Sequence, residues 1–171
     1  EDLFAPPPPL VAARYAISRA ATGPRFPRRL RRQTMVLDFE KAFLNGDMER
    51  WVCISLPDED ARKQGGANVR LLRKSMYGLR EAPAIWQRVV RDLMSQLGFT
   101  ACVSMPCVYY HHLRDLVVVA HVDDFLVSGP REELIRLKEE IRANYDCVCE
   151  ILGDEPGQSA LSSDQPLEEY N

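Results

Sequence analysis

The chain lacks the features that would place it in a membrane or outside the cell. No uninterrupted apolar run approaches the length of a membrane-spanning helix, and residues 1–30 contain no apolar core of a signal peptide. Its five cysteines are an odd number without a CxxC pair, which argues against a disulfide framework and against a structural zinc site. The sequence therefore predicts a soluble intracellular protein without a membrane partner.

The chain also lacks a strong overall charge, but its charges are unevenly distributed. The net charge is −3 over 171 residues, whereas residues 1–34 carry seven arginines against two carboxylates, and residues 123–171 carry thirteen carboxylates against four basic side chains. A basic end suits a polyanion and an acidic end suits cations, although an ordinary solvated surface would look the same. With 46% hydrophobic residues, the chain is long enough for one domain with a core and short for two.

Residues 1–32 form a proline- and arginine-rich entry segment. It opens with four consecutive prolines, and the spacing of apolar residues over 10–21 predicts a helix. The expected core contacts of this helix are Leu10, Ala13, Tyr15 and Ile17. A basic loop over residues 25–32 is a candidate phosphate clamp and equally a solvated insertion. Its candidate contacts are Arg28, Arg29, Arg31 and Arg32.

Residues 33–153 carry alternating strand and helix signals. Strands are expected over residues 33–39, 51–56, 69–72, 107–112, 115–121 and 125–129, and helices over residues 83–97 and 131–145. The run 115–121 is unbroken and apolar, as in a central strand buried on both faces. Residues 58–68 are expected to be a loop, and residues 154–171 a polar, poorly ordered tail. This order predicts an α+β domain with helices packed on one face of a largely antiparallel sheet.

An aspartate pair follows the most apolar of these strands. Val122 leads into Asp123 and Asp124, and another apolar run begins at Phe125. A plain turn is one interpretation, because aspartate tolerates turn geometry well. Val122 argues against it, since a simple turn favours Gly or Asn over a β-branched residue. Two neighbouring carboxylates also repel each other less when a divalent cation neutralises them.

Asp38 stands in the same context, after the apolar residues 35–37 and before Phe39. If the two strands end side by side, Asp38 and Asp123 come together and could hold two divalent ions about 3.5–4 Å apart, the arrangement used for in-line nucleotidyl transfer. Spacing alone leaves this open, because single aspartates after strands are common.

Several blocks of the sequence resemble copia-type reverse transcriptases. Residues 37–47 (LDFEKAFLNGD) are similar to the family block that contains AFLNGD, residues 72–86 (LRKSMYGLREAPAIW) to LxKSLYGLKQAPRxW, and residues 121–124 (HVDD) to the YVDD box. Residues 1–6 and 97–109 are similar to the entry and linker of the same region, so the resemblance extends over residues 1–153 in the family's order.

The resemblance implies a polymerase palm that carries out RNA-directed DNA synthesis. Asp38 and Asp123 would then ligate two Mg²⁺ or Mn²⁺ ions, with Asp124 as a less direct third carboxylate. Phe43 falls five residues after Asp38, where the family places an aromatic gate against a ribose 2′-hydroxyl, although a core aromatic is the other interpretation. The remaining implied substrate contacts are Phe39, Tyr77, Gly78, Pro83 and His121, with Arg80 as a weaker nucleic-acid contact. Trp86 is interpreted as helix core.

The implied partners are an RNA template, a DNA primer, a deoxynucleoside triphosphate and the rest of a Pol polyprotein, including integrase and RNase H. The implied location is the cytoplasm, in a virus-like particle, or the nucleus.

Some residues depart from the family pattern. His121 stands where the family has Tyr, Glu81 stands where it has Gln, and no basic residue lies near Val148. The family's fingers would precede residue 1 and its thumb and RNase H region would follow residue 171, so the chain is interpreted as a fragment with incomplete fingers and thumb. An inactive remnant that binds nucleic acid or a partner through its arginines stays an alternative. A nucleotide cyclase is a further alternative, which the YGL–AP–W block disfavours.

Overall fold

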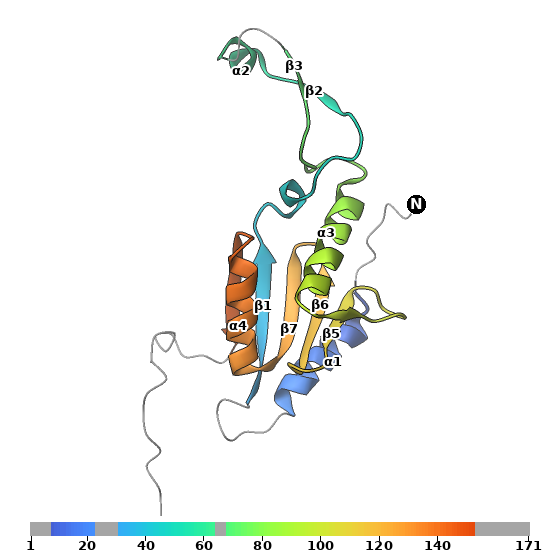
Figure 1. Cartoon of the computed structure of the whole chain (residues 1–171), viewed down its shortest axis with the longest axis vertical. Coiled ribbons are helices and arrows are strands. Elements are labelled where there is room, and N and C mark those ends of the chain that lie inside the picture. The colour runs from blue at the N-terminus through green and yellow to red at the C-terminus, as the bar shows by residue number, and fades with distance from the viewer. Residues whose placement is uncertain (1–7, 23–30, 64–67, 153–171) are drawn as a thin grey trace, which may run out of the picture.

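The structure, a computed structural model, describes residues 8–22, 31–63 and 68–152 and centres on a six-stranded sheet (Figure 1). Every pair of neighbouring strands in this sheet is antiparallel, as predicted. In sheet order the strands are β4 (Thr100–Ala101), β5 (Val108–His111), β6 (Leu116–His121), β7 (Asp124–Pro130), β1 (Arg32–Phe39) and β8 (Cys147–Leu152). Strands β4 and β8 were not expected from the sequence.

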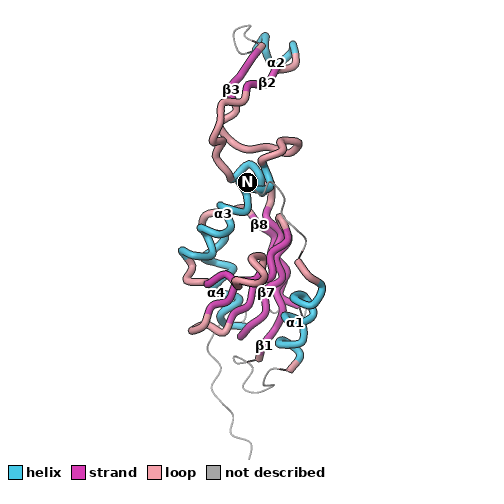
Figure 2. Tube along the Cα trace, turned by 90° about the vertical axis from the view of Figure 1, so that its right-hand side faces the viewer, coloured by secondary structure: helices cyan, strands magenta, loops and turns pink. Residues whose placement is uncertain are grey.

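Helices cover both faces of this sheet (Figure 2). Helices α3 (Ala82–Gln96) and α4 (Arg131–Arg142) lie on one face, and α1 (Leu10–Ala21) lies on the other. The expectation that helices pack on one face is therefore wrong for α1. The physical reason is that β6 is apolar on both sides, and its residues Leu116–Val119 are all buried, so each face needs a cover.

The main core lies between the sheet and helices α3 and α4. Along the strands, alternate side chains enter this core, as the period of two requires. Its largest fully buried members are Trp86, Phe39, Met35, Leu37, Met94, Leu116, Leu134, Leu137, Ile141, Val118 and Val127. A smaller core on the opposite face joins Ala12 and Ala16 of α1 to Val117 and Val119 of β6.

Helix α1 has the predicted bounds but packs through a different side. Its buried residues are Ala12 and Ala16, whereas Leu10, Tyr15 and Ile17 are 65%, 53% and 53% exposed. The predicted core contacts of Leu10, Tyr15 and Ile17 are therefore wrong. Alanines allow the helix backbone to approach the sheet closely, which larger side chains at these positions would prevent.

A two-stranded extension projects beyond one end of the sheet (Figure 1). It consists of β2 (Cys53–Ser55) and β3 (Val69–Leu71), with the short helix α2 (Asp58–Lys63) between them. The expectation of a loop over residues 58–68 is wrong for α2. Three acidic residues occupy its first turn, where they interact favourably with the helix dipole.

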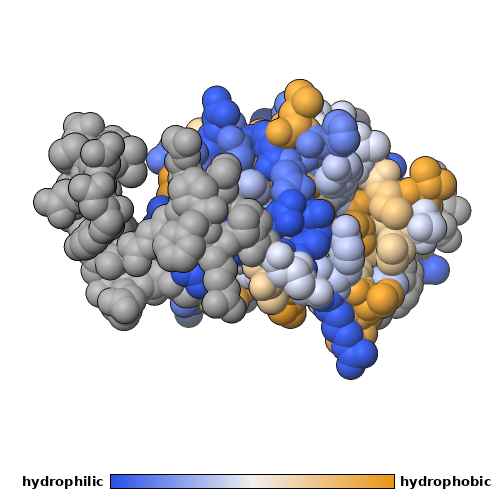
Figure 3. Space-filling view, turned by 90° about the horizontal axis from the view of Figure 1, so that it is seen from below, coloured by the Kyte–Doolittle hydropathy of each residue, from blue (hydrophilic) through white to orange (hydrophobic). Residues whose placement is uncertain are grey.

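Ion pairs hold the opposite end of the sheet together. Asp115, in the β5–β6 turn, accepts hydrogen bonds from Arg19 of α1 and from Arg32 of β1, whose Nε lies 2.8 Å from Asp115 Oδ2. Burial alone would raise the pKa of Asp115, but these hydrogen bonds lower it. Arg114 pairs with Glu133 and Glu140 of α4. A band of hydrophilic side chains crosses the molecule when it is viewed from this end (Figure 3).

No helix among the described residues is long and apolar enough to cross a membrane. The predicted tail of residues 154–171 lies outside the described part of the chain.

Candidate active site

The three predicted aspartates meet at the end of the sheet from which the extension projects. Strands β1 and β7 pair in a register that puts Asp38 directly opposite Asp124. The backbone N–H of Phe39 also donates to the carbonyl oxygen of Asp123, at 3.0 Å. Strand β1 ends beside the start of β7, and β7 lies between β1 and β6, so the two strands that precede the aspartates are not neighbours; the hairpin turn after β6 brings Asp123 toward Asp38.

The three carboxylates influence one another electrostatically. Asp38 is exposed, yet partial desolvation and then the charges of Asp123 and Asp124 raise its pKa above the ordinary value. Carboxylate oxygens are the ligands that Mg²⁺ and Mn²⁺ prefer, so the chemistry of these three side chains suits divalent ions of this kind. Over residues 8–22, 31–63 and 68–152, no three His, Cys, Asp or Glu side chains form a ready-made metal cluster.

The turn that carries Asp123 has an unusual backbone. Because His121 pairs with Asp124, the β6–β7 hairpin closes through only Val122 and Asp123, which we call the acidic turn. Val122 has a φ of 53°, whereas Asp123 is not among the positive-φ residues. This is the pattern of a type II′ turn, in which glycine normally occupies the first central position. A β-branched residue there costs about 1–3 kcal/mol of strain, so this turn is more than a simple connection.

Trp86 of α3 is hydrogen-bonded to the acidic turn. Its indole Nε1 lies 2.5 Å from the carbonyl oxygen of Val122, and the side chain is 1% exposed. The interpretation of Trp86 as helix core is confirmed, but its contact with the turn was missed. A buried indole N–H needs an acceptor, and this requirement was the available signal.

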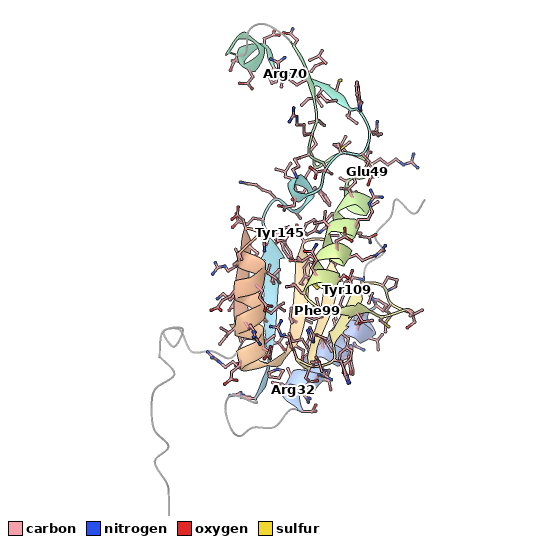
Figure 4. The ribbon with its side chains drawn as sticks, viewed as in Figure 1. Arg32, Glu49, Arg70, Phe99, Tyr109 and Tyr145 are labelled. Atoms are coloured by element: carbon pink, nitrogen blue, oxygen red, sulfur yellow. The ribbon has the colours of Figure 1, made fainter. Side chains whose placement is uncertain are left out.

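Phe39 does not lie where a substrate contact was expected. Its ring is buried and packs edge-on against Trp86, Phe125 and Tyr145, with centroid distances of 5.2, 4.9 and 5.6 Å. Tyr145 follows the end of α4, which is three residues shorter than expected, and lies at the upper end of the sheet (Figure 4). Since side chains alternate along a strand, Phe39 supports the site from the core while Asp38 points to the other face.

Two of the other predicted contacts form an aromatic pair. Phe43 lies in the 3₁₀ helix η2 (Ala42–Asn45), and its ring centroid is 4.7 Å from that of the exposed Tyr77. A hydrogen bond connects the segment of Phe43 to the segment of Tyr77, because the carbonyl of Gly46 accepts from the N–H of Ser75 at 2.8 Å. Gly78 has a φ of 91°, which glycine adopts without strain.

The two residues that differ from the family pattern, His121 and Glu81, each lie close to a charged residue. His121 is exposed and lies opposite Asp124 across the hairpin. Glu81 is the residue immediately before α3, and Pro83 lies in the first turn of that helix. Glu81 accepts a hydrogen bond from Arg50 Nε at 2.5 Å. That bond lowers the pKa of Glu81, so its negative charge is locally compensated.

One of the predicted arginine contacts lies away from the aspartates. Arg32 lies at the far end of the sheet (Figure 4), paired with Asp115. Arg31 precedes it and is exposed, and Arg80 is also exposed. Arg28 and Arg29 lie outside the described residues.

Comparison with known proteins identifies the family. A model of the reverse transcriptase (RNA-dependent DNA polymerase) family matches residues 29–154. The chain is 30% identical over 152 residues to the retrovirus-related Pol polyprotein from transposon TNT 1-94 of Nicotiana tabacum, covering 85% of this chain and 11% of the relative. It is 33% identical over 95 residues to the Pol polyprotein from transposon RE1 of Arabidopsis thaliana, covering 54% of this chain and 6% of the relative.

A third relative is a putative transposon Ty5-1 protein of Saccharomyces cerevisiae. It is 27% identical over 112 residues, which cover 64% of this chain and 36% of the relative. The chain thus spans much less than two thirds of each relative. It belongs to the reverse transcriptase family, of the copia type found in these retrotransposon Pol polyproteins.

Proposed function

We propose that this chain carries the palm site of an RNA-directed DNA polymerase. The reaction is nucleotidyl transfer from a deoxynucleoside triphosphate to the 3′-hydroxyl of a DNA primer on an RNA template. The observation that carries this proposal is the register of β1 and β7, which puts Asp38 opposite Asp124 and beside Asp123.

The aspartates have distinct roles in this proposal. Asp38 and Asp123 hold the divalent ions, and Asp124 is the less direct third carboxylate. The ions, Mg²⁺ or Mn²⁺, stabilise the attacking and leaving oxygens of an in-line displacement. Partial desolvation and then the charges of Asp123 and Asp124 raise the pKa of Asp38, and a bound cation would relieve the second of these causes, which supports this assignment.

The aromatic pair supplies selection of the nucleotide. Phe43 acts as the gate against a ribose 2′-hydroxyl, and its contact with Tyr77 limits how far its ring can turn away. Gly78 and Pro83 lie in the segment that follows Tyr77, and they line the nascent base pair. His121, which is exposed beside Asp124, donates a hydrogen bond toward the primer.

The remaining parts of the Pol polyprotein are proposed as partners. The chain corresponds to about a tenth of the tobacco relative's length, so fingers, thumb, integrase and RNase H are other parts of such a polyprotein. Those parts are proposed to add positive charge around the triphosphate, which accelerates phosphoryl transfer, so extension by the chain alone should be slow.

Primer extension tests the proposal directly. Purified chain is incubated with an RNA template, a DNA primer, deoxynucleotides and Mg²⁺ or Mn²⁺, beside Asp123→Asn and the control Asp92→Asn, an exposed aspartate on α3. Extension by the parent chain and by Asp92→Asn, with loss of at least about 100-fold in Asp123→Asn, is the expected result. Binding of the template without extension, unchanged by Asp123→Asn, would instead identify a nucleic-acid-binding remnant.

A further inference from the structure

We propose that Trp86 is a positioning residue for the acidic turn, whose indole N–H holds the carbonyl of Val122 and so keeps Asp123 beside Asp38. The inference rests on the proposed function, because the alignment matters for the ions that these aspartates would bind. Trp86 would touch neither ion nor substrate.

The backbone of the acidic turn needs an external restraint. Glycine would adopt the positive φ of Val122 without cost, but a β-branched side chain does not. The neighbouring ladder pairs, His121 with Asp124 and Asp38 with Asp124, hold the two ends of the turn, but neither pair includes the Val122–Asp123 peptide. The bond from Trp86 is attached to the carbonyl of that peptide.

The indole and the turn restrain each other. Trp86 is almost completely buried, and its N–H is a donor with no other role. If the Val122 carbonyl rotated away, this donor would be left unpaired in the core, which costs more than the loss of an exposed hydrogen bond. Rotation of the turn is therefore opposed from α3 as well as from the sheet.

A series of contacts joins α3 to strand β1, which carries Asp38, and to the acidic turn, which carries Asp123. Trp86 packs edge-on against Phe39, at 5.2 Å between centroids, which fixes the plane of the indole. The N–H of Phe39 donates to the carbonyl of Asp123, and Asp38 precedes Phe39. A change at Trp86 therefore reaches Asp38 and Asp123 together.

Affinity for Mn²⁺, measured by electron paramagnetic resonance, tests this role without requiring turnover. Trp86→Phe removes the donor and keeps an aromatic ring, and we expect it to weaken Mn²⁺ binding about three- to tenfold, as for one buried hydrogen bond. Tyr109→Phe, which removes a hydroxyl from another buried aromatic away from the turn, should change affinity less than about twofold.

Val122→Gly separates positioning from packing. With glycine, the turn keeps its positive φ without help, so Trp86→Phe in the Val122→Gly background should cost less than about twofold. An equal loss in both backgrounds would assign Trp86 to packing alone and overturn the proposal, as would no loss in either. If Asp123→Asn leaves Mn²⁺ affinity unchanged, the proposed metal site itself is wrong, which is a different outcome.

A second measurement needs no substitution at Trp86. The two tryptophans give separate indole N–H resonances, and Trp51, which is 90% exposed on the loop before β2, is an internal reference. Titration with Mg²⁺ should shift the Trp86 resonance and leave that of Trp51 unchanged. A Trp86 resonance that does not move, while Asp123→Asn abolishes Mn²⁺ binding, would overturn the positioning role.

Discussion

Asp38 and Asp124 face each other across the β1–β7 ladder, which is an unfavourable arrangement for two carboxylates. The same arrangement is favourable for a pair of ligands. If Asp38 binds an ion as proposed, stability and ion binding make opposite demands on it. Partial desolvation and then the neighbouring carboxylates raise its pKa.

Asp38→Asn should stabilise the fold at neutral pH when divalent ions are chelated. Like charges directly opposite cost about 0.2–1 kcal/mol, toward the lower end for exposed groups, so we expect a rise in Tm of about 1–2 °C. Because the folded-state pKa of Asp38 is raised, its penalty applies above that pKa and disappears below the ordinary value of 3.8. The gain should vanish in melts below pH 3.8, and a gain independent of pH would contradict this cause.

Gly46 is required by close packing. A Cβ at this position would lie 2.3 Å from Ile85 Cγ2 of α3, so Gly46→Ala must displace the Ile85 side chain, the helix or the 3₁₀ turn. Overpacking of this kind costs about 1–3 kcal/mol, or about 3–10 °C in Tm. The loss should be smaller when Gly46→Ala is introduced beside Ile85→Ala, and an equal loss in both backgrounds would exclude the clash as its cause.

At the scale of elements, helix α1 shows how burial is decided by fit as well as by hydrophobicity. Its larger apolar side chains face outward, and Ala12 and Ala16 face β6. The helix is also attached to the sheet end through Arg19 and Asp115. This combination of close packing and an ion pair holds α1 against the sheet.

Two substitutions in α1 should differ sharply in effect. Ala16→Leu inserts a large side chain at the buried contact with β6 and should destabilise the chain by about 1–3 kcal/mol. Ile17→Ala, on the exposed side, should change stability by less than about 0.5 kcal/mol. Chemical denaturation measures both. A larger loss for Ile17→Ala would mean that α1 packs through its other side.

For the whole molecule, ion binding should be coupled to global folding. Asp38 and Asp123 lie far apart in the sequence and come together only when β1 pairs with β7. An ion that both residues ligate therefore binds the folded chain and not the unfolded chain.

Mn²⁺ should consequently raise the Tm of the whole chain. An ion present at 100 times its Kd contributes about 2.7 kcal/mol, which corresponds to about 5–10 °C for a chain of this size. Asp123→Asn should lose most of this shift, whereas Asp92→Asn should keep it. Equal shifts in all three chains, measured by differential scanning fluorimetry, would place the bound ion elsewhere.

Much of the fold could be predicted from local patterns. Helices α1 and α3 and strands β1, β5, β6 and β7 occupy nearly the predicted residues, because each has a clear apolar period or a clear stop signal. Strand β8 was missed, since two of its outward residues, Val148 and Leu152, are apolar like the inward ones, so the sequence shows no apolar–polar alternation. Helix α2 was missed because all of its residues but Ala61 are charged and give no apolar period.

The sequence alone identified the aspartates and their strand–turn setting, because chemistry and apolar period are local properties of a chain. The resemblance to the family followed from the sequence blocks around them. Only the tertiary structure could show that Asp38 lies opposite Asp124, that Trp86 bonds to Val122, that Phe39 faces the core and that Arg32 pairs with Asp115. Each of these depends on strand register and on packing between distant segments, and register is set by which side chains fit together when the sheet and helices close.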